Sequence, residues 1–298
     1  MKRALPAAIA AILLLSSAAN TATPGAIFRD PPADKAHPAT VDSVEFASGG
    51  SALAAQIFHA AGGGIHPVAL ICHGFPGNEQ NLDLARALQR AGWAVVTFHY
   101  RGSWGSEGAF TFRGGVADAK AILARLKTPK PEWGIDPSRL IVIGHSYGGY
   151  VAARAAADTP GVTGVALIAP WDMADTARST AKMTEKQKHG MEADLAGEAK
   201  ARLAGTSGAA MVKEILGAAD LDLTLLAPAL ARMPVLLLTA SRDTPDDQAA
   251  GLQAALGKIP GAHLSAARME TDHGFDDRRI ALESAILDWA AGLPGAPR

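Results

Sequence analysis

The sequence predicts an α/β protein: a mostly parallel, twisted sheet of about eight strands with helices on both faces. Two observations carry this prediction. From residue 40 onward, short apolar runs alternate with longer amphipathic segments, which is the pattern of strand–helix–strand units. Several runs, such as residues 68–72 and 140–143, are wholly apolar, as strands buried on both faces of a sheet are.

The first two runs, residues 41–47 and 52–59, flank Gly49-Gly50 and predict an antiparallel hairpin at the edge of the sheet. Further strands are expected at residues 68–72, 93–98, 140–143, 165–168, 235–239 and 263–269. Helices are expected at residues 80–91, 116–127, 147–157, 248–256 and 279–290. The apolar faces of the first two helices are expected to carry Leu82, Leu84, Ala85 and Leu88, and Val116, Ile122, Leu123 and Leu126.

Residues 171–233 interrupt this rhythm, because they separate two expected strands by far more than an ordinary connection. Their composition predicts helices at 172–188, 191–203 and 209–216. We expect this insertion to form a small helical cap over the carboxyl edge of the sheet, where open α/β sheets bind ligands. The alternative is a peripheral decoration that does not contact the substrate.

The amino terminus has the pattern of a secretory signal peptide. Lys2 and Arg3 precede an apolar run over residues 4–15, and small residues follow up to an expected cleavage after Ala19. An uncleaved membrane anchor is the alternative, but the run is short for a span. Residues 20–40 then read as a flexible lead-in and 41–292 as a single domain. We therefore expect an exported protein, periplasmic or secreted, with no stable membrane span after cleavage.

The bulk composition excludes some classes of function. The chain has 298 residues, of which 48% are hydrophobic and 19% charged, and its formal net charge is −1. No basic surface is therefore expected for binding nucleic acid. The single cysteine, Cys72, lies within an expected strand and is interpreted as a small buried hydrophobic residue.

Residues 140–149 carry the sharpest chemical signal. An apolar run leads into Gly144-His145-Ser146-Tyr147-Gly148, and an alanine-rich segment follows. A strand, a tight turn and a helix in this order form a nucleophile elbow, with Ser146 at its apex. A Cβ at Gly144 or Gly148 is expected to collide with the neighbouring strand or helix.

An activated serine needs an acid and a histidine base, which should follow it along the chain in that order. Asp243 comes just after the expected strand 235–239, and His273 lies in the final strand-to-helix loop. Histidine suits the base because its ordinary pKa lies near neutral pH. The rival acids are Asp246, Asp247 and, as a minor alternative, Asp272. The other histidines near the elbow fit less well, because His145 points away and His73 precedes the serine.

The oxyanion hole is expected to use two backbone N–H groups, those of Tyr147 and Phe75. Phe75 lies in His73-Gly74-Phe75-Pro76-Gly77, the loop after the expected strand 68–72, where Gly74 lets the backbone turn inward. The remaining candidates for the substrate pocket are His73, Gly74, Tyr100, Arg101, Trp104 and Trp171.

These motifs together resemble those of the α/β-hydrolases over about residues 41–292. Within that fold the chain is similar to the dienelactone hydrolase and prolyl-oligopeptidase-like serine esterase branch. The resemblance rests on residues 73–77, the Tyr100–Ser106 loop, the elbow, Asp243 and His273. The chain departs from dienelactone hydrolases by having serine at the elbow, and from prolyl oligopeptidases by lacking room for a β-propeller. Their substrates therefore do not transfer.

The resulting expectation is an exported serine hydrolase that cleaves a carboxylic ester, or a related acyl bond, of a small molecule without metal or organic cofactor. A peptidase acting on short peptides is the alternative, and would use Glu107, Arg101 or Asp172 to hold a terminal charge. A non-catalytic binding protein on the same fold is a third interpretation. The sequence does not indicate an oligomeric state.

Overall fold

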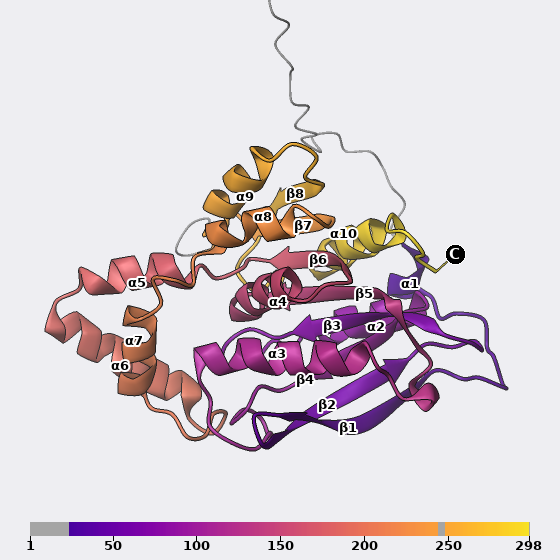
Figure 1. The fold of residues 1–298 in the computed structure, drawn as a ribbon, viewed down its shortest axis with the longest axis horizontal. Coiled ribbons are helices and arrows are strands. Elements are labelled where there is room, and N and C mark those ends of the chain that lie inside the picture. Colours follow the sequence, from indigo (N-terminus) through magenta and orange to yellow (C-terminus); the bar gives the residue numbers. More distant parts are fainter. Residues whose placement is uncertain (1–23, 244–247, 298) are drawn as a thin grey trace, which may run out of the picture.

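The computed structural model describes residues 24–243 and 248–297. Its eight strands form one sheet in the order β1-β2-β4-β3-β5-β6-β7-β8 (Figure 1). The pairs β1–β2 and β2–β4 are antiparallel, whereas all other neighbours are parallel. The strands are β1 (Thr40–Ser48), β2 (Ser51–His59), β3 (His66–Cys72), β4 (Ala94–Phe98), β5 (Ile135–His145), β6 (Val162–Ile168), β7 (Val235–Ala240) and β8 (Leu264–Met269). The predicted fold class and the edge hairpin are confirmed.

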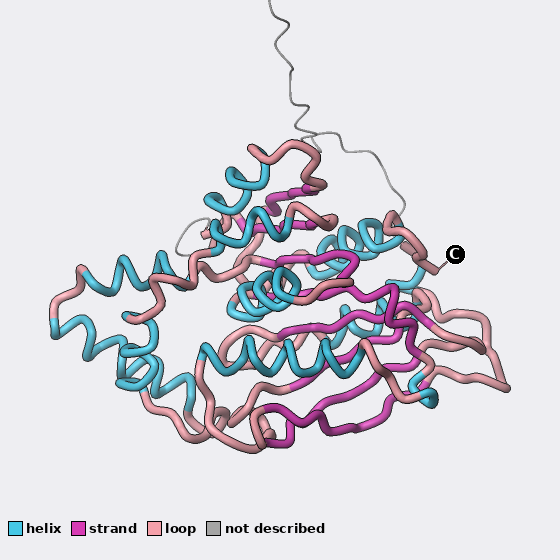
Figure 2. The backbone as a smooth tube through the Cα atoms, in the orientation of Figure 1, coloured by secondary structure: helices cyan, strands magenta, loops and turns pink. Residues whose placement is uncertain are grey.

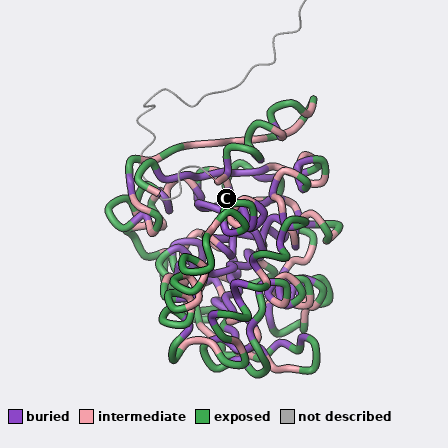
Figure 3. The backbone as a smooth tube through the Cα atoms, turned by 90° about the vertical axis from the view of Figure 1, so that its left-hand side faces the viewer, coloured by how far each residue is buried: buried purple, intermediate pink, exposed green. Residues whose placement is uncertain are grey.

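Helices cover both faces of the sheet, and each face has its own apolar core. One core joins the strands to α3, α4 and α9, and the other joins them to α2 and α10. The helices outside the insertion are α1 (Gly25–Phe28), α2 (Leu82–Arg90), α3 (Phe112–Leu126), α4 (Tyr147–Asp158), α9 (Ala250–Gly257) and α10 (Arg279–Ala291), with a 3₁₀ turn, η1, at Pro131–Trp133. Figure 3 shows the buried backbone in the middle of the molecule and exposed backbone around it.

The elements of the insertion are α5 (Met173–Ala181), α6 (Glu185–Ala199), α7 (Gly208–Leu216), η2 (Leu223–Leu226) and α8 (Ala227–Leu230). Three helices of the insertion, α5, α6 and α7, lie together beyond the carboxyl edge of the parallel strands (Figures 1 and 2), whereas α8 lies beside α9 over the sheet. Glu214 of α7 accepts hydrogen bonds from the backbone N–H groups of Phe112 and Arg113, at the start of α3. The first N–H groups of a helix have no acceptor within that helix, and Glu214 supplies one here. These bonds join the insertion to the main domain.

The predicted break between the first two helices of the insertion is wrong. The break falls at Thr184, and α6 then runs through Gly190. The reason is a capping box: the Gln187 N–H donates to Thr184 Oγ1, and the Thr184 N–H donates to Gln187 Oε1 at 2.9 Å. These reciprocal bonds fix the helix start at Glu185, six residues before the predicted start at residue 191.

Other details of the helices also differ from the prediction. Helix α3 begins at Phe112 rather than at residue 116, because the Thr111 side chain accepts the Gly114 N–H and caps the helix. Leu82 at the start of α2 is 40% exposed, so it lies outside the apolar face. Part of the expected flexible lead-in is the short helix α1, whose Ile27 carbonyl accepts a hydrogen bond from Arg90.

Within the described residues, no helix is both long and apolar enough to cross a membrane. The expected signal peptide, residues 1–19, lies outside the described residues.

Candidate active site

Ser146 occupies a strained turn between β5 and α4. Its backbone φ is +56°, in a region that residues with a Cβ rarely adopt. The Ser146 N–H donates to the Ile168 carbonyl at 2.9 Å, and its own carbonyl accepts from the Trp171 N–H. The ends of β5 and β6 therefore hold the turn in place. Strain that is retained in this way marks functional positions.

The glycines on both sides of Ser146 allow this turn to form. A Cβ at Gly144 would lie 2.0 Å from the Gly148 carbonyl oxygen. A Cβ at Gly148 would lie 2.1 Å from the Cys72 carbonyl oxygen, at the end of β3. Both distances are far below van der Waals contact with rigid backbone, so the collisions expected from the sequence are confirmed.

Asp243 and His273 are brought together by the loops that follow β7 and β8. His273 Nδ1 donates to Asp243 Oδ2 at 2.9 Å. This bond assigns the proton to Nδ1, so the lone pair of Nε2 remains available to accept a proton. Asp272 makes a different contact, since its Oδ1 accepts the Asp276 N–H within the same loop. The other rival acids, Asp246 and Asp247, lie outside the described residues.

The loop of residues 73–77 passes directly over the serine. A Cβ on Gly74 would lie 3.2 Å from Ser146 Cβ, so the Gly74 backbone packs against the elbow. Phe75 follows in this loop and lines the same cavity as Ser146. Tyr147 is the first residue of α4, where a backbone N–H has no acceptor within the helix and the helix dipole favours negative charge.

A cavity of about 210 Å³ brings these residues together, and we call it the Ser146 cavity. Much of its wall is apolar, and Gln248 and Thr239 add polar groups. Its described lining is Phe75, Ser146, Ala169, Pro170, Trp171, Thr239, Ala240, Asp243, Gln248, Ala249 and His273. The volume lies below the range of about 300–1,000 Å³ typical of drug-sized ligands, so the described walls fit a small group.

Two neighbours of this cavity were not expected from the sequence. His145 is fully buried, and its Nε2 donates to the His273 carbonyl oxygen at 2.8 Å. Gln248 accepts the Asp172 N–H with its Oε1 at 2.9 Å, which joins the loop before α9 to the start of the insertion. No spacing rule connects residues so far apart in the chain. The only local signal was a polar residue shortly after the apolar run 140–143.

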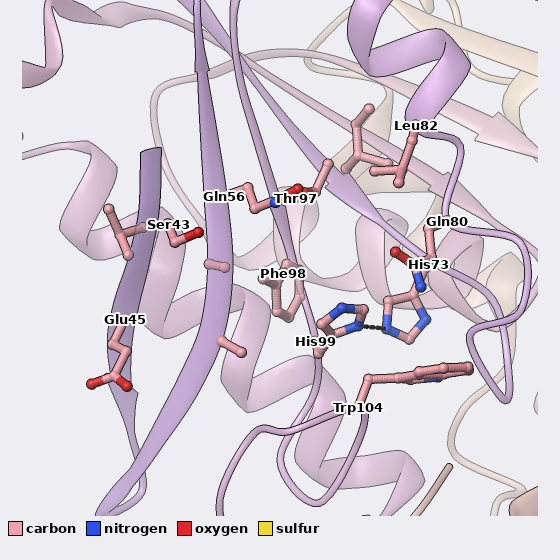
Figure 4. Close-up of a pocket in the computed structure, with 14 residues that line it drawn as sticks. Ser43, Glu45, Gln56, His73, Gln80, Leu82, Thr97, Phe98, His99 and Trp104 are labelled. Carbon is pink, nitrogen blue, oxygen red and sulfur yellow. Dashed lines mark hydrogen bonds between the residues drawn. The ribbon is translucent and has the colours of Figure 1, made fainter. Parts of the chain in front are cut away.

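Two of the expected pocket residues, His73 and Trp104, line a second cavity of about 700 Å³, which we call the His73 cavity (Figure 4). His99 Nδ1 lies 3.3 Å from His73 Nε2 in its wall. The indole N–H of Trp104 donates to the Pro76 carbonyl oxygen at 2.9 Å. His73 thus belongs to the 73–77 loop and Trp104 contacts it, but neither residue lines the Ser146 cavity.

Tyr100 and Arg101 also lie away from the Ser146 cavity. Tyr100 is buried, with its hydroxyl donating to the His73 carbonyl at 2.9 Å. Arg101 Nε lies 2.7 Å from an oxygen of the buried Asp118 side chain. Trp171, by contrast, lines the Ser146 cavity as expected. It is the only described residue of the insertion in that lining.

Burial determines the charge of His145, His73 and the Cys72 thiol. It lowers the pKa of His145 to about 4, with a smaller contribution from the neighbouring His273. It lowers the pKa of His73 to about 3, opposed in part by the bond to the Gly74 carbonyl. Both imidazoles are therefore neutral at pH 7. Burial raises the pKa of the Cys72 thiol, which keeps it protonated and unreactive.

Comparison with protein families agrees with this geometry. A family described as alpha/beta hydrolase fold matches residues 67–265. The chain belongs to the α/β-hydrolase family. Esterase Pf2001 of Pyrococcus furiosus, at 16% identity, superimposes with a TM-score of 0.67 over 89% of this chain and 98% of that structure. At this identity the likeness shows a shared fold.

Curated relatives of this hydrolase match shorter stretches. Uncharacterized protein Rv2307c of Mycobacterium tuberculosis (strain ATCC 25618 / H37Rv) is 34% identical over 131 residues, which are 44% of this chain and 46% of the relative. Lysophosphatidylserine lipase ABHD12 of Danio rerio is 38% identical over 92 residues, 30% of this chain and 23% of the relative. The matched stretches thus span less than half of each relative's length.

Proposed function

We propose that this α/β-hydrolase is an exported serine esterase that cleaves the carboxylic ester of a small substrate through an acyl-enzyme. The observation that carries the proposal is the convergence of Ser146, the His273–Asp243 pair and the Phe75 loop on one cavity. The parts come from four separate loops at one edge of the sheet. Such an arrangement is the one that nucleophilic catalysis by serine requires.

In this mechanism Ser146 Oγ attacks the ester carbonyl while its proton moves to His273 Nε2. The negative oxygen that forms is held by the N–H groups of Phe75 and Tyr147. The imidazolium, stabilised by Asp243, then protonates the leaving alcohol, and the carbon–oxygen ester bond breaks. Water then attacks the acyl carbonyl and gives a proton to His273, which passes this proton to Ser146 Oγ as the acyl–oxygen bond breaks and the acid leaves.

The small cavity supports a short acyl group as the preferred acyl part. Trp171 and Phe75 supply flat apolar walls, and Ala169, Ala240 and Ala249 leave the space between them. Apolar walls with a few placed polar groups are typical of small-molecule sites. Esters of acetate and butyrate are therefore the first substrates to test.

The decisive experiment replaces the nucleophile. In Ser146→Ala, turnover of p-nitrophenyl acetate should fall by about 10⁴-fold or more, since removing one member of such a triad removes most of its catalysis. Ser284→Ala is the matched control, because this hydroxyl bonds the Ile280 carbonyl on the outer helix α10. A fluorophosphonate probe should label wild type at Ser146. Unchanged turnover and labelling in the folded Ser146→Ala variant would overturn the proposal. Wild type that neither turns over the ester nor reacts with the probe would favour a binding protein.

A peptidase would need a charged group in the cavity to hold a peptide terminus. Glu107 instead accepts the Ala52 N–H at the edge hairpin, Arg101 contacts Asp118, and Asp172 caps α5. None of the three belongs to the described lining of the Ser146 cavity. Esters should therefore be turned over much faster than aminoacyl p-nitroanilides, and the reverse preference would favour a peptidase.

Export is a separate part of the proposal and rests on residues 1–19. The mature chain should begin at Asn20, the residue after the small-residue cleavage site. N-terminal sequencing of the protein from the periplasmic or culture fraction measures this directly. A chain that retains residues 1–19 and stays in the membrane fraction would show an uncleaved anchor instead.

A further inference from the structure

His145 connects the nucleophile's strand to the backbone of the proposed base. It is the last residue of β5, directly before Ser146, and its Nε2 lies 2.8 Å from the carbonyl oxygen of His273. The two residues are 128 positions apart in the chain. Their rings also lie against each other, with centroids 4.8 Å apart.

The partners of His145 define its tautomer. A carbonyl oxygen only accepts, so the hydrogen is on Nε2 and the other ring nitrogen carries a lone pair. That nitrogen, Nδ1, is buried and has no hydrogen-bond partner among the described residues. The Gly74 backbone packs beside it, since a Cβ on Gly74 would lie 3.4 Å from His145 Nδ1. The imidazole thus fills the space between the 73–77 loop and His273.

We propose that His145 is a positioning residue for the acyl-transfer reaction: its Nε2–H bond to the His273 carbonyl fixes the main chain that aims the His273 ring at Ser146. This inference rests on the proposed function. Because the bond begins on the residue next to the serine, it sets the base directly against the nucleophile's own strand. His145 acts through His273 and does not contact the substrate.

A merely structural role would explain the burial of His145 equally well, but it makes a different prediction. If the ring only fills space, a side chain of similar size without a donor would serve as well. If the bond positions the base, the loss of the donor should lower the rate of the chemical step and leave substrate binding unchanged. A displacement of about 1 Å from the reactive geometry can cost about 10²-fold in rate.

The test compares His145→Gln with His145→Met in the mature chain. These side chains have the same length, but only glutamine places an N–H near the position of Nε2. For p-nitrophenyl acetate, kcat of His145→Met should fall about 10- to 100-fold with KM within about threefold. For His145→Gln, kcat should remain at least about tenfold above that of the methionine variant. His145→Asn, whose amide is too short to reach the carbonyl, should behave like methionine and replaces it if the methionine variant does not fold.

A spectroscopic measurement separates this inference from the proposed function. The downfield proton resonance of the His273–Asp243 hydrogen bond should persist in His145→Gln and shift or broaden in His145→Met, whether or not Ser146 is the nucleophile. Equal kcat values and equal resonances in the two variants would overturn the positioning role. Hydrolysis that survives Ser146→Ala would instead overturn the esterase proposal, while the resonances still decide the role of His145.

Discussion

The two cavities that share the 73–77 loop surround their histidines with different groups. In the Ser146 cavity, His273 is partly exposed and hydrogen-bonded to the Asp243 carboxylate. In the His73 cavity, His73 is buried, and its ring nitrogens bond the Gly74 carbonyl and the neutral His99. A carboxylate partner stabilises an imidazolium, whereas burial without one opposes it. Residue type alone therefore does not identify the base. The hydrogen-bond partner and the exposure of a histidine determine whether it can accept and hold a proton.

The largest expected effect comes from making the same substitution in both cavities. His273→Asn should lower kcat/KM for p-nitrophenyl acetate by about 10⁴-fold or more, because the proton acceptor of Ser146 is lost. His73→Asn should stay within about tenfold of wild type, since its amide can still donate to the Gly74 carbonyl. Equal losses in the two variants would mean that the comparison between the cavities is wrong.

Asp243→Asn tests the partner that distinguishes the two histidines. An amide can hold the His273 ring in the wrong tautomer and does not stabilise its cation, so we expect a loss of about 10²- to 10⁴-fold in kcat. Asp272→Asn is the matched control. Asp272 directly precedes His273 in the chain, and its carboxylate accepts the Asp276 N–H rather than a proton from His273. A larger loss of kcat in Asp272→Asn than in Asp243→Asn would mean that Asp272, and not Asp243, is the acid that supports His273.

Most of the fold and the elbow could be predicted because their signals are local. Gly144 and Gly148 lie within two residues of Ser146, and the strands are short apolar runs. The pocket walls depend instead on the order of strands in the sheet. Strand β3 separates β4 from β5, so the residues that follow β4, such as Trp104, lie on the far side of the 73–77 loop from Ser146. The sequence shows that these loops share one edge, but it does not show their order.

His145 was misjudged for the same reason. The residue before the nucleophile was expected to point away, but the loop that carries His273 passes beside it. Nothing near either residue in the sequence signals a contact across 128 positions. The start of α6 was different, since the capping box at Thr184 and Gln187 is a local signal, and the prediction from composition did not use it.

Substitution of one tryptophan in each cavity tests which walls the substrate contacts. Trp171 lines the Ser146 cavity, and Trp104 lines the His73 cavity. Trp171→Ala should enlarge the acyl site and shift the preference from acetate to longer p-nitrophenyl esters by about tenfold, measured as the ratio of kcat/KM values. Trp104→Ala should leave that ratio within about twofold. A shift confined to Trp104→Ala would place the acyl chain in the His73 cavity.

The smallest expected effect is on stability in mild acid. The pKa of His73 is lowered in the folded state to about 3, from an ordinary value of about 6.5 in the unfolded chain. Between these values the unfolded chain binds a proton that the folded chain does not. The free energy of unfolding therefore falls with decreasing pH, by about 1.4 kcal/mol per pH unit for this one group once the unfolded histidine is protonated.

His73→Asn should remove this contribution. Urea unfolding at pH 6.0, 5.5 and 5.0 should give a slope of stability against pH that is smaller than in wild type by about 1.2 kcal/mol per unit, since the unfolded histidine is not yet fully protonated at pH 6.0. His189→Asn is the control, because that side chain is 76% exposed on α6. The slope is the decisive quantity, since the lost packing at residue 73 lowers stability equally at each pH. An unchanged slope in His73→Asn would show that burial does not lower the pKa of His73, and the contrast between the two cavities would then rest on hydrogen-bond partners alone.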